Sequence, residues 1–170
     1  MRGVSRLGWT AYVLALLIIV ADQASKYWIL EAFQLPLRPS THVAGPLSLT
    51  MVWNQGVSFG LLWADHGFVR WALAAFSIGV SILLAAWVRR AERPLMAWAL
   101  AFIMGGALGN VIDRIRFGAV ADFLDVSALG FFPWVFNIAD AAINVGIGLL
   151  LIDMLLTERK QKRAASSPPA

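Results

Sequence analysis

The sequence predicts an all-α polytopic membrane protein with four transmembrane helices and a small extracytoplasmic β-element. Of its 170 residues, 59% are hydrophobic and 14% are charged, whereas a soluble domain averages about 45–50% apolar and about 25% charged residues. Four apolar segments are each long enough, at about 1.5 Å per helical residue, to approach the roughly 30 Å hydrocarbon thickness of a bilayer. Basic residues gather between these segments and beside them.

The four spans are expected at residues 8–30, 69–88, 95–113 and 138–156. The second is the clearest, because its apolar run from Trp71 to Val88 contains no charged residue. The first also resembles a secretory signal peptide, but we favour a retained helix, since three more spans follow and apolar residues resume after Lys26. We therefore expect one four-helix membrane domain over residues 1–157 and a disordered basic cytoplasmic tail over residues 158–170.

The distribution of charge predicts the orientation in the membrane. Basic clusters occur at residues 2–6, before the first span, at residues 89–93, between the second and third, and at residues 159–163, after the fourth. By the positive-inside rule these clusters are cytoplasmic, so both termini lie inside. The pI near 10.1 is then a signal of topology, and we expect no nucleic-acid partner. The chain has no cysteine, which excludes disulfides and thiolate metal sites.

The segment outside the membrane between the first two spans, residues 31–67, is expected to contain β-structure. Its prolines and glycine interrupt any helix. The alternation that follows predicts a strand, and its apolar positions, expected on one face, are Leu47, Leu49, Met51 and Trp53. Asn54–Gly56 then form a turn. A second extracytoplasmic stretch, residues 117–136, could hold another short strand.

Polar residues gather at the outer ends of three of the four spans. Asp22 and Lys26 are four residues apart on one helical face and can pair. The third span ends, and the fourth begins, with carboxylates, amides and a cation: Asn110, Asp113, Arg114, Asn137, Asp140 and Asn144. Asp122 lies between these two spans. Singly, these groups are explained as ion pairs, among them Asp113 with Arg114, or as a helix cap. Their convergence at one depth favours a functional site, since charge in a membrane is costly.

Asp122 and Asp140 could form an aspartic-protease pair. Like charges held close cannot both ionise readily, so one carboxyl keeps a proton. The ionised partner then activates a water, and the protonated one donates to the substrate. Two alternatives stay open: a Mg²⁺-dependent phosphoryl-transfer enzyme acting on lipid headgroups, and a small ion or proton transporter.

Four blocks of the sequence resemble the lipoprotein signal peptidase (signal peptidase II) family, which are aspartic intramembrane endopeptidases. The blocks are DQASK (22–26), NQGVSFG (54–60), GNVIDRIRFGAVADFLD (109–125) and FNIADAAIN (136–144). They occur in order, each at a predicted outer edge of the membrane. With the four-span layout, the resemblance extends over residues 4–157.

The resemblance implies that Asp122 and Asp140 are the catalytic dyad. It also implies that nine further residues bind substrate or support the site: Asp22, Lys26, Asn54, Gly56, Asn110, Asp113, Arg114, Asn137 and Ala141. The implied substrate is a prolipoprotein whose lipobox Cys carries diacylglycerol, cut before that Cys. The family implies no metal and no other cofactor, contact with membrane lipids, inhibition by cyclic peptides of the globomycin type, and a location in the bacterial cytoplasmic (inner) membrane with the site near its extracytoplasmic face.

Overall fold

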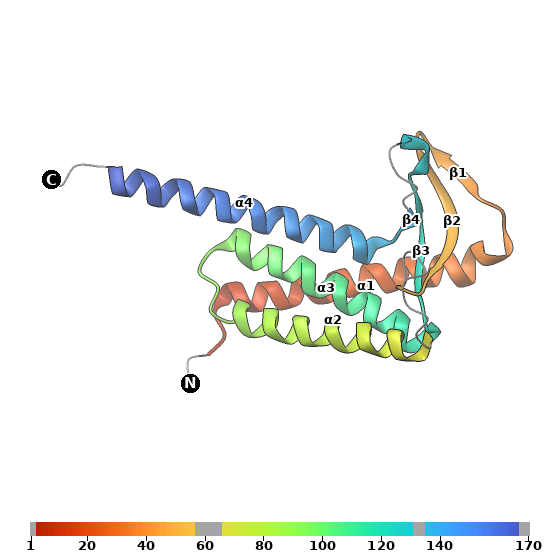
Figure 1. Cartoon of the computed structure of the whole chain (residues 1–170), viewed down its shortest axis with the longest axis horizontal. Helices are drawn as coiled ribbons and strands as arrows, with labels where there is room; N and C mark the ends of the chain where they lie inside the picture. The colour runs from red at the N-terminus through yellow and green to blue at the C-terminus, as the bar shows by residue number, and fades with distance from the viewer. Residues whose placement is uncertain (1–2, 57–65, 131–134, 167–170) are drawn as a thin grey trace.

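The computed structural model describes residues 3–56, 66–130 and 135–166, and in these it has four long helices and a four-stranded sheet (Figure 1). The helices are α1 (Arg6–Tyr27), α2 (His66–Val88), α3 (Pro94–Phe117) and α4 (Ile138–Ser166). The strands are β1 (Thr41–Ala44), β2 (Leu47–Asn54), β3 (Val120–Asp125) and β4 (Val135–Phe136). A π-helical turn (Trp28–Ala32) continues α1.

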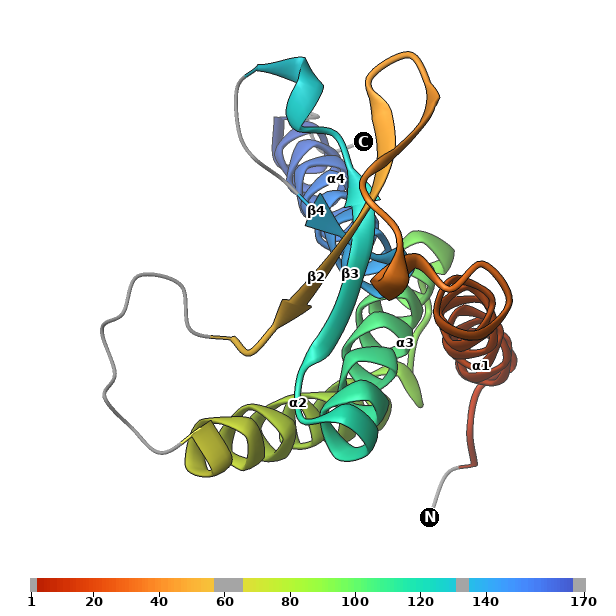
Figure 2. The same cartoon turned by 90° about the vertical axis from the view of Figure 1, so that its right-hand side faces the viewer.

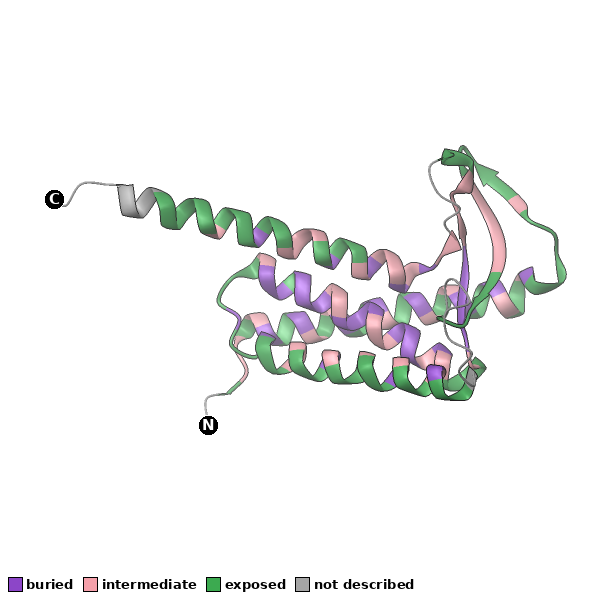
Figure 3. Ribbon diagram, in the orientation of Figure 1, coloured by how far each residue is buried: buried purple, intermediate pink, exposed green. Residues whose placement is uncertain are grey.

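The four helices are each long and apolar enough to cross a membrane, so four long apolar helices are present where the spans were predicted. α3 packs against all three of the others, and the sheet lies across one end of the bundle (Figures 1 and 2). Burial is concentrated on α3, while large apolar side chains on the other helices stay exposed (Figure 3). Exposed apolar side chains of this number suit contact with lipid chains rather than water.

Glycines on α3 let its neighbours approach closely, as the small residues in this segment predict. A Cβ at Gly105 would lie 2.8 Å from Ile18 of α1, and one at Gly109 would lie 2.6 Å from the carboxylate of Asp22. A Cβ at Gly106 would overlap the carbonyl oxygen of Ala139 at the start of α4. The three glycines therefore bring the polar ends of α1, α3 and α4 together.

The sheet is antiparallel with the order β1-β2-β3-β4, so β3 lies between β2 and β4. A cluster of buried side chains, Ile29, Leu35 and Phe123, seats it on the outer end of α1. β2 pairs with β3 through Leu49 opposite Leu124 and Val52 opposite Asp122, so a bulge lies between these pairs. A bulge adds one residue to its strand and so switches the faces of the side chains that follow.

The bulge corrects one prediction for β2. Leu49 and Met51 pack with the apolar cluster under the sheet, as expected. Trp53 does not share that face, because the bulge intervenes, and it is exposed and packs against the Phe117 ring instead. The short strand expected within residues 117–136 is present as β3 and carries Asp122, whereas β1 was not predicted. Residues 57–65 of the predicted insert, which include most of NQGVSFG, lie outside the described residues.

Two helix ends also differ from prediction. α3 continues to Phe117, four residues beyond the predicted end, and stops where Gly118 takes a φ of +82°. α4 continues to Ser166, so the prediction of a disordered tail is wrong for residues 158–166. The residues there favour helix, and Glu158 pairs with Lys162 one turn later at 2.6 Å.

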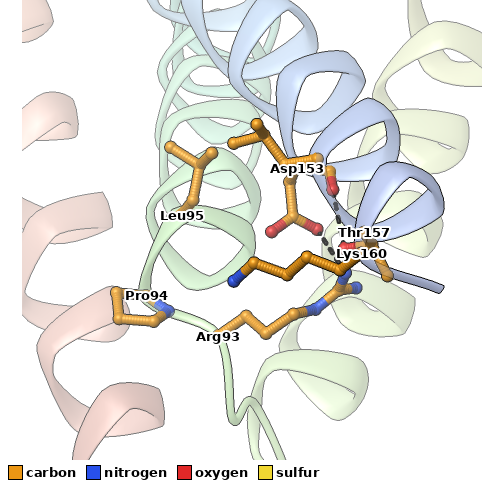
Figure 4. A pocket seen from close by; sticks show the side chains of 7 residues that line it. Arg93, Pro94, Leu95, Asp153, Thr157 and Lys160 are labelled. Carbon is orange, nitrogen blue, oxygen red and sulfur yellow. Dashed lines mark hydrogen bonds and ion pairs between the residues drawn. The ribbon is translucent and has the colours of Figure 1, made fainter. Parts of the chain in front are cut away.

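At the end of the bundle away from the sheet, α4 is tied to the start of α3 (Figure 4). Arg93 Nη1 lies 2.9 Å from Asp153 Oδ2 and also donates to the hydroxyl of Thr157. These residues line a cavity of about 280 Å³ with Lys160 and Leu95. Asp153 is 5% exposed, so it is a buried ion-pair partner of Arg93.

Candidate active site

Asp140 is held by a reciprocal cap at the start of α4. The Asp140 N–H donates to Asn137 Oδ1 at 2.9 Å, and the Asn137 N–H donates to Asp140 Oδ2 at 3.3 Å. This is the arrangement of a capping box, which satisfies two N–H groups at a helix start. The other carboxylate oxygen, Oδ1, accepts from Asn110 Nδ2 at 2.8 Å. Both oxygens of the half-buried Asp140 are therefore fixed in place.

Asp122 is presented by the central strand β3 and is 2% exposed. Its Oδ1 accepts from Asn137 Nδ2 at 2.6 Å, and its Oδ2 accepts from Asn54 Nδ2 at 3.0 Å. The bulge in β2 places Asn54 on the same face as Asp122. Burial first, and then the charge of Asp140, raises the pKa of Asp122 to about 6, against the lowering effect of Asn54, Asn137 and Lys26.

Two buried amides join the two carboxylates. Asn137 bonds to Asp122 with its Nδ2 and to the Asp140 N–H with its Oδ1. Asn110 bonds to Asp140 with its Nδ2, and its Oδ1 accepts from Asn137 at 3.2 Å and from Lys26 at 3.3 Å. Asn137 is fully buried and Asn110 is 7% exposed. The amides thus link β3, α3 and α4 in one network.

Lys26 lies at the base of this network. Its Nζ is 2.8 Å from Asp22 Oδ2 and 2.7 Å from Asp113 Oδ2. The predicted pairing of Asp22 with Lys26 is confirmed. The predicted pairing of Asp113 with Arg114 is wrong, because successive residues of a helix point in different directions and Asp113 faces α1.

Arg114 lies beside the carboxylates, and the described residues use little of its hydrogen-bonding capacity. Within the described part of the chain, its one hydrogen bond runs from Nη1 to the carbonyl oxygen of Asn110, at 3.4 Å. Its guanidinium interacts electrostatically with Asp140, Asp122 and Asp113. A half-buried cation with free donors can bind a carbonyl or carboxylate oxygen of a ligand.

Gly56 forms the edge of the site nearest Arg114. Its N–H donates to Asn54 Oδ1 at 2.8 Å, and its φ of +81° is one that residues with a side chain rarely adopt. A Cβ there would also overlap the side chain of Leu73. This turn orients Asn54 so that its Nδ2 faces Asp122. Ala141, directly after Asp140, lies half-buried in the first turn of α4.

Most of the polar residues predicted to converge do lie together in the site. Asn144 does not, and Gln23 is an additional member. Asn144 is exposed on α4, and among the described residues its side chain has no hydrogen-bond partner. Gln23 was not predicted, although it lies between Asp22 and Lys26. Its Nε2 faces Asp22 Oδ2, Asp113 Oδ1 and the Gly109 carbonyl oxygen at 2.9–3.2 Å. The polarity of Gln23 at a membrane-helix position was the signal available.

The grouping of acidic side chains bears on the magnesium alternative. Among residues 3–56, 66–130 and 135–166, no three His, Cys, Asp or Glu side chains are grouped so that they could hold a metal ion. Asp22 and Asp113 are instead shared with the Lys26 ammonium. Lys26 therefore occupies the place beside these two carboxylates where a bound cation would otherwise lie.

Four membrane-length helices under a small antiparallel sheet, with a buried polar network between them, define a multi-pass membrane enzyme. Two solved structures, both described as a bacterial membrane enzyme, superpose with TM-scores of 0.75 at 26% and 28% identity. The matches cover 100% and 91% of this chain and 98% and 97% of the other chains.

Sequence comparison identifies the family. The model described as signal peptidase (SPase) II matches residues 14–156. The lipoprotein signal peptidase of Caulobacter vibrioides is 51% identical over 159 residues, which cover 93% of this chain and 94% of that one. The lipoprotein signal peptidase of Methylobacterium radiotolerans is 42% identical over 160 residues, with 94% and 92% covered. The chain belongs to the signal peptidase II family of aspartic peptidases.

Proposed function

We propose that Asp122 and Asp140 are the catalytic pair with which this enzyme removes the signal peptide of a prolipoprotein. Lipoprotein signal peptidase is the activity of its family. The observation that carries the assignment of the pair is the position of Asn137, whose side chain bonds both to Asp122 and to the backbone of Asp140. Two carboxylates from separate elements are thereby held over one buried amide.

The electrostatics of the pair suit acid–base catalysis. Because burial and the charge of Asp140 raise the pKa of Asp122 to about 6, the pair retains one shared proton in weakly acidic solution. The ionised carboxylate takes a proton from water, whose oxygen bonds to the scissile carbonyl carbon, while the protonated carboxyl donates to the carbonyl oxygen. The carboxyl that took the water proton then gives it to the leaving amine as the C–N bond breaks, and the other carboxylate takes a proton back from a hydroxyl of the intermediate, which restores the carbonyl and the singly protonated pair. The two carboxyls titrate as a unit.

The remaining residues are assigned by what they contact. Arg114, with its free donors, binds a carbonyl oxygen of the substrate beside the pair, while Asn54, Gly56 and Ala141 form the adjoining wall. The other predicted residues support the site: Asp22, Lys26, Asn110, Asp113 and Asn137. The substrate is a prolipoprotein with a diacylglyceryl-Cys, cut before that Cys, whose acyl chains lie along the apolar outer faces of the helices. Cyclic peptides of the globomycin type compete for the same site.

The same proposal places the molecule in the membrane. Residues 1–157 form a single membrane domain of the bacterial cytoplasmic membrane, with both termini cytoplasmic. The basic connection around Arg93 lies at the end of the bundle away from the sheet (Figures 1 and 4). By the positive-inside rule the sheet and the carboxylate pair then lie at the extracytoplasmic face. A substrate exported through the membrane meets the site there.

The test is cleavage of a purified diacylglyceryl-modified prolipoprotein by the purified enzyme. Asp122→Asn and Asp140→Asn should each lower kcat at least about 1,000-fold, because each removes one partner of the acid–base pair. Asp125→Asn is the matched control, since Asp125 lies on the same strand and bonds to Thr50 and Ser127 instead. EDTA should leave the rate unchanged. Near-normal cleavage by either Asn variant, or an EDTA-sensitive rate restored by Mg²⁺, would overturn the proposal.

A further inference from the structure

Beneath the carboxylate pair lies a group of buried ions that the proposed chemistry does not use. Lys26 contacts both Asp22 and Asp113, and all three are at most 2% exposed. Burying three ions costs desolvation free energy that their attraction often fails to recover. A gain in folding stability is therefore a weak explanation for these buried ions, and their contacts with the backbone near the catalytic pair suggest a positioning role.

Each of the two acids also accepts a hydrogen bond from the backbone beside a different member of the catalytic pair. Asp22 Oδ1 accepts from the Ala139 N–H at 3.0 Å, directly before Asp140. Asp113 Oδ2 accepts from the Ala121 N–H at 3.1 Å, directly before Asp122. One acid thus anchors the first turn of α4 and the other anchors β3. Both bonds are between buried groups; the first joins residues that are 117 apart in sequence and the second joins residues that are eight apart.

Gln23 connects the two acids a second time, without charge. Its Nε2 lies 3.1 Å from Asp22 Oδ2, 2.9 Å from Asp113 Oδ1 and 3.2 Å from the Gly109 carbonyl oxygen. An amide nitrogen has two hydrogens, so they are shared among three acceptors. Gln23 therefore crosses from α1 to α3 beside the Lys26 ammonium and ties the same two carboxylates.

We infer that Lys26, Gln23, Asp22 and Asp113 form a clamp that sets the separation and orientation of Asp122 and Asp140. The inference rests on the proposed catalytic role of that pair. These four are positioning residues, because their hydrogen bonds within the described part of the chain reach the pair through the Ala121 and Ala139 backbones and through Asn110. Gln23 is the member that sequence reasoning did not identify.

A clamp on the backbone adds to the contacts that already join the two carboxylates, which are the side-chain amides of Asn137 and Asn110 and the short pairing of β3 with β4. β3 follows α3 and Asp140 begins α4, so a tilt of either element changes the space for the attacking water. A displacement of about 1 Å of catalytic groups can cost about 100-fold in rate. Contacts that hold backbone, rather than side-chain rotamers alone, limit such displacement.

The sharpest variant is Gln23→Met, which keeps the length of the side chain and removes its hydrogen bonds without changing charge. We expect kcat for a diacylglyceryl-modified prolipoprotein to fall about 10- to 100-fold, with KM within about twofold of the parent, because ground-state binding is untouched. Asp22→Asn should behave alike. It leaves Lys26 and Asp113 as a balanced pair, but its amide nitrogen must face either the ammonium or the Ala139 N–H, which are both donors.

Tyr12→Phe is the matched control. It removes a bond between α1 and α2, from Tyr12 Oη to the Ala85 carbonyl oxygen at 2.8 Å, away from the carboxylate pair. It should lower the Tm in detergent without lowering kcat. If Tyr12→Phe lost kcat in the same proportion to its Tm as Gln23→Met, the clamp would be merely structural and the inference wrong.

A double variant tests whether the residues act together. If Gln23 and Asp22 serve one clamp, the loss of kcat in Gln23→Met/Asp22→Asn is smaller than the product of the single losses. Multiplicative losses would contradict this. Asp122→Asn separates the two levels of proposal. If it cleaves normally, the catalytic pair is wrong; if it is inactive while Gln23→Met and Asp22→Asn keep the parent kcat, the pair stands and the clamp alone fails.

Discussion

Asp122 and Asp125 lie three residues apart on the same strand, and their pKa values are shifted in opposite directions. Burial and the nearby charge of Asp140 raise the pKa of Asp122 to about 6. The pKa of Asp125 is instead lowered, because its half-buried carboxylate accepts hydrogen bonds from Ser127 and Thr50. Environment rather than residue type therefore separates a reactive carboxyl from an ordinary one.

The raised pKa of Asp122 predicts how activity depends on pH, and substitution of Asn54 tests this dependence. The pair works with one proton, so kcat/KM should fall above about pH 6, where that proton is lost, by about tenfold per pH unit. Asn54 donates to Asp122 and lowers its pKa, as do Asn137 and the charge of Lys26. Asn54→Ala should therefore raise that pKa and move the fall in kcat/KM to higher pH.

The measurement is a pH profile of kcat/KM for the parent and for Asn54→Ala. Thr50→Ala serves as the control, since Thr50 Oγ1 donates to Asp125 at 2.7 Å and not to Asp122. It should leave the profile in place. A fall that moved to lower pH in Asn54→Ala would show that this amide does not stabilise the ionised form.

The sequence predicted which residues belong to the site better than it predicted which of these residues contact one another. Asp122, Asp140 and Lys26 were predicted because charge at a membrane boundary stands out from an apolar sequence. The partner of Asp113 was predicted wrongly and Gln23 was missed. Both depend on how far α1 and α3 rotate about their axes, which the Gly105 and Gly109 contacts decide and the order of spans does not.

Among the elements, long periodic segments were predicted and short or irregular ones were not. The four spans and β2 were expected in place. β4 has two residues and β1 is mostly exposed, so neither carries enough alternation to be seen. The bulge in β2 has no sequence signal either, yet it brings Asn54 to Asp122. The helical extension of α4 beyond residue 157 was missed because charge was taken to mean disorder, although charged residues can favour helix.

The packing of α3 against α1 gives a prediction about two glycines. Gly109→Ala would place a Cβ 2.6 Å from Asp22 Oδ2, so we expect it to lower stability by about 1–3 kcal/mol and to lower kcat by displacing Asp22. Gly79→Ala on α2 is the control, because nothing lies within 4 Å of its Cβ. It should be neutral or raise stability by up to about 1 kcal/mol. Thermal unfolding in detergent checks both, and equal Tm values for the two variants would refute the close-packing account.

At the scale of the whole molecule, the two ends of the bundle have different chemistry. The sheet end carries the paired carboxylates, the clamp and the apolar cluster on which β3 rests. The other end carries the basic connection between α2 and α3 and the Arg93–Asp153 pair (Figure 4). α1 begins and α4 ends at this second end (Figure 1). The charge pattern predicted this separation of the basic connection from the acidic site along the bundle axis. Which of the two ends faces an exported substrate is part of the orientation that we propose.

The orientation can be tested directly because the chain contains no cysteine. Ala128 is exposed in the turn after β3, and Glu92 is exposed between α2 and α3 at the opposite end. With Ala128→Cys, a membrane-impermeant maleimide should label the protein in intact spheroplasts. With Glu92→Cys it should label only after lysis, because the positive-inside rule places the Arg-rich connection in the cytoplasm. The reverse pattern would place the carboxylate pair on the cytoplasmic side, where a signal peptide that has already been exported could not reach it.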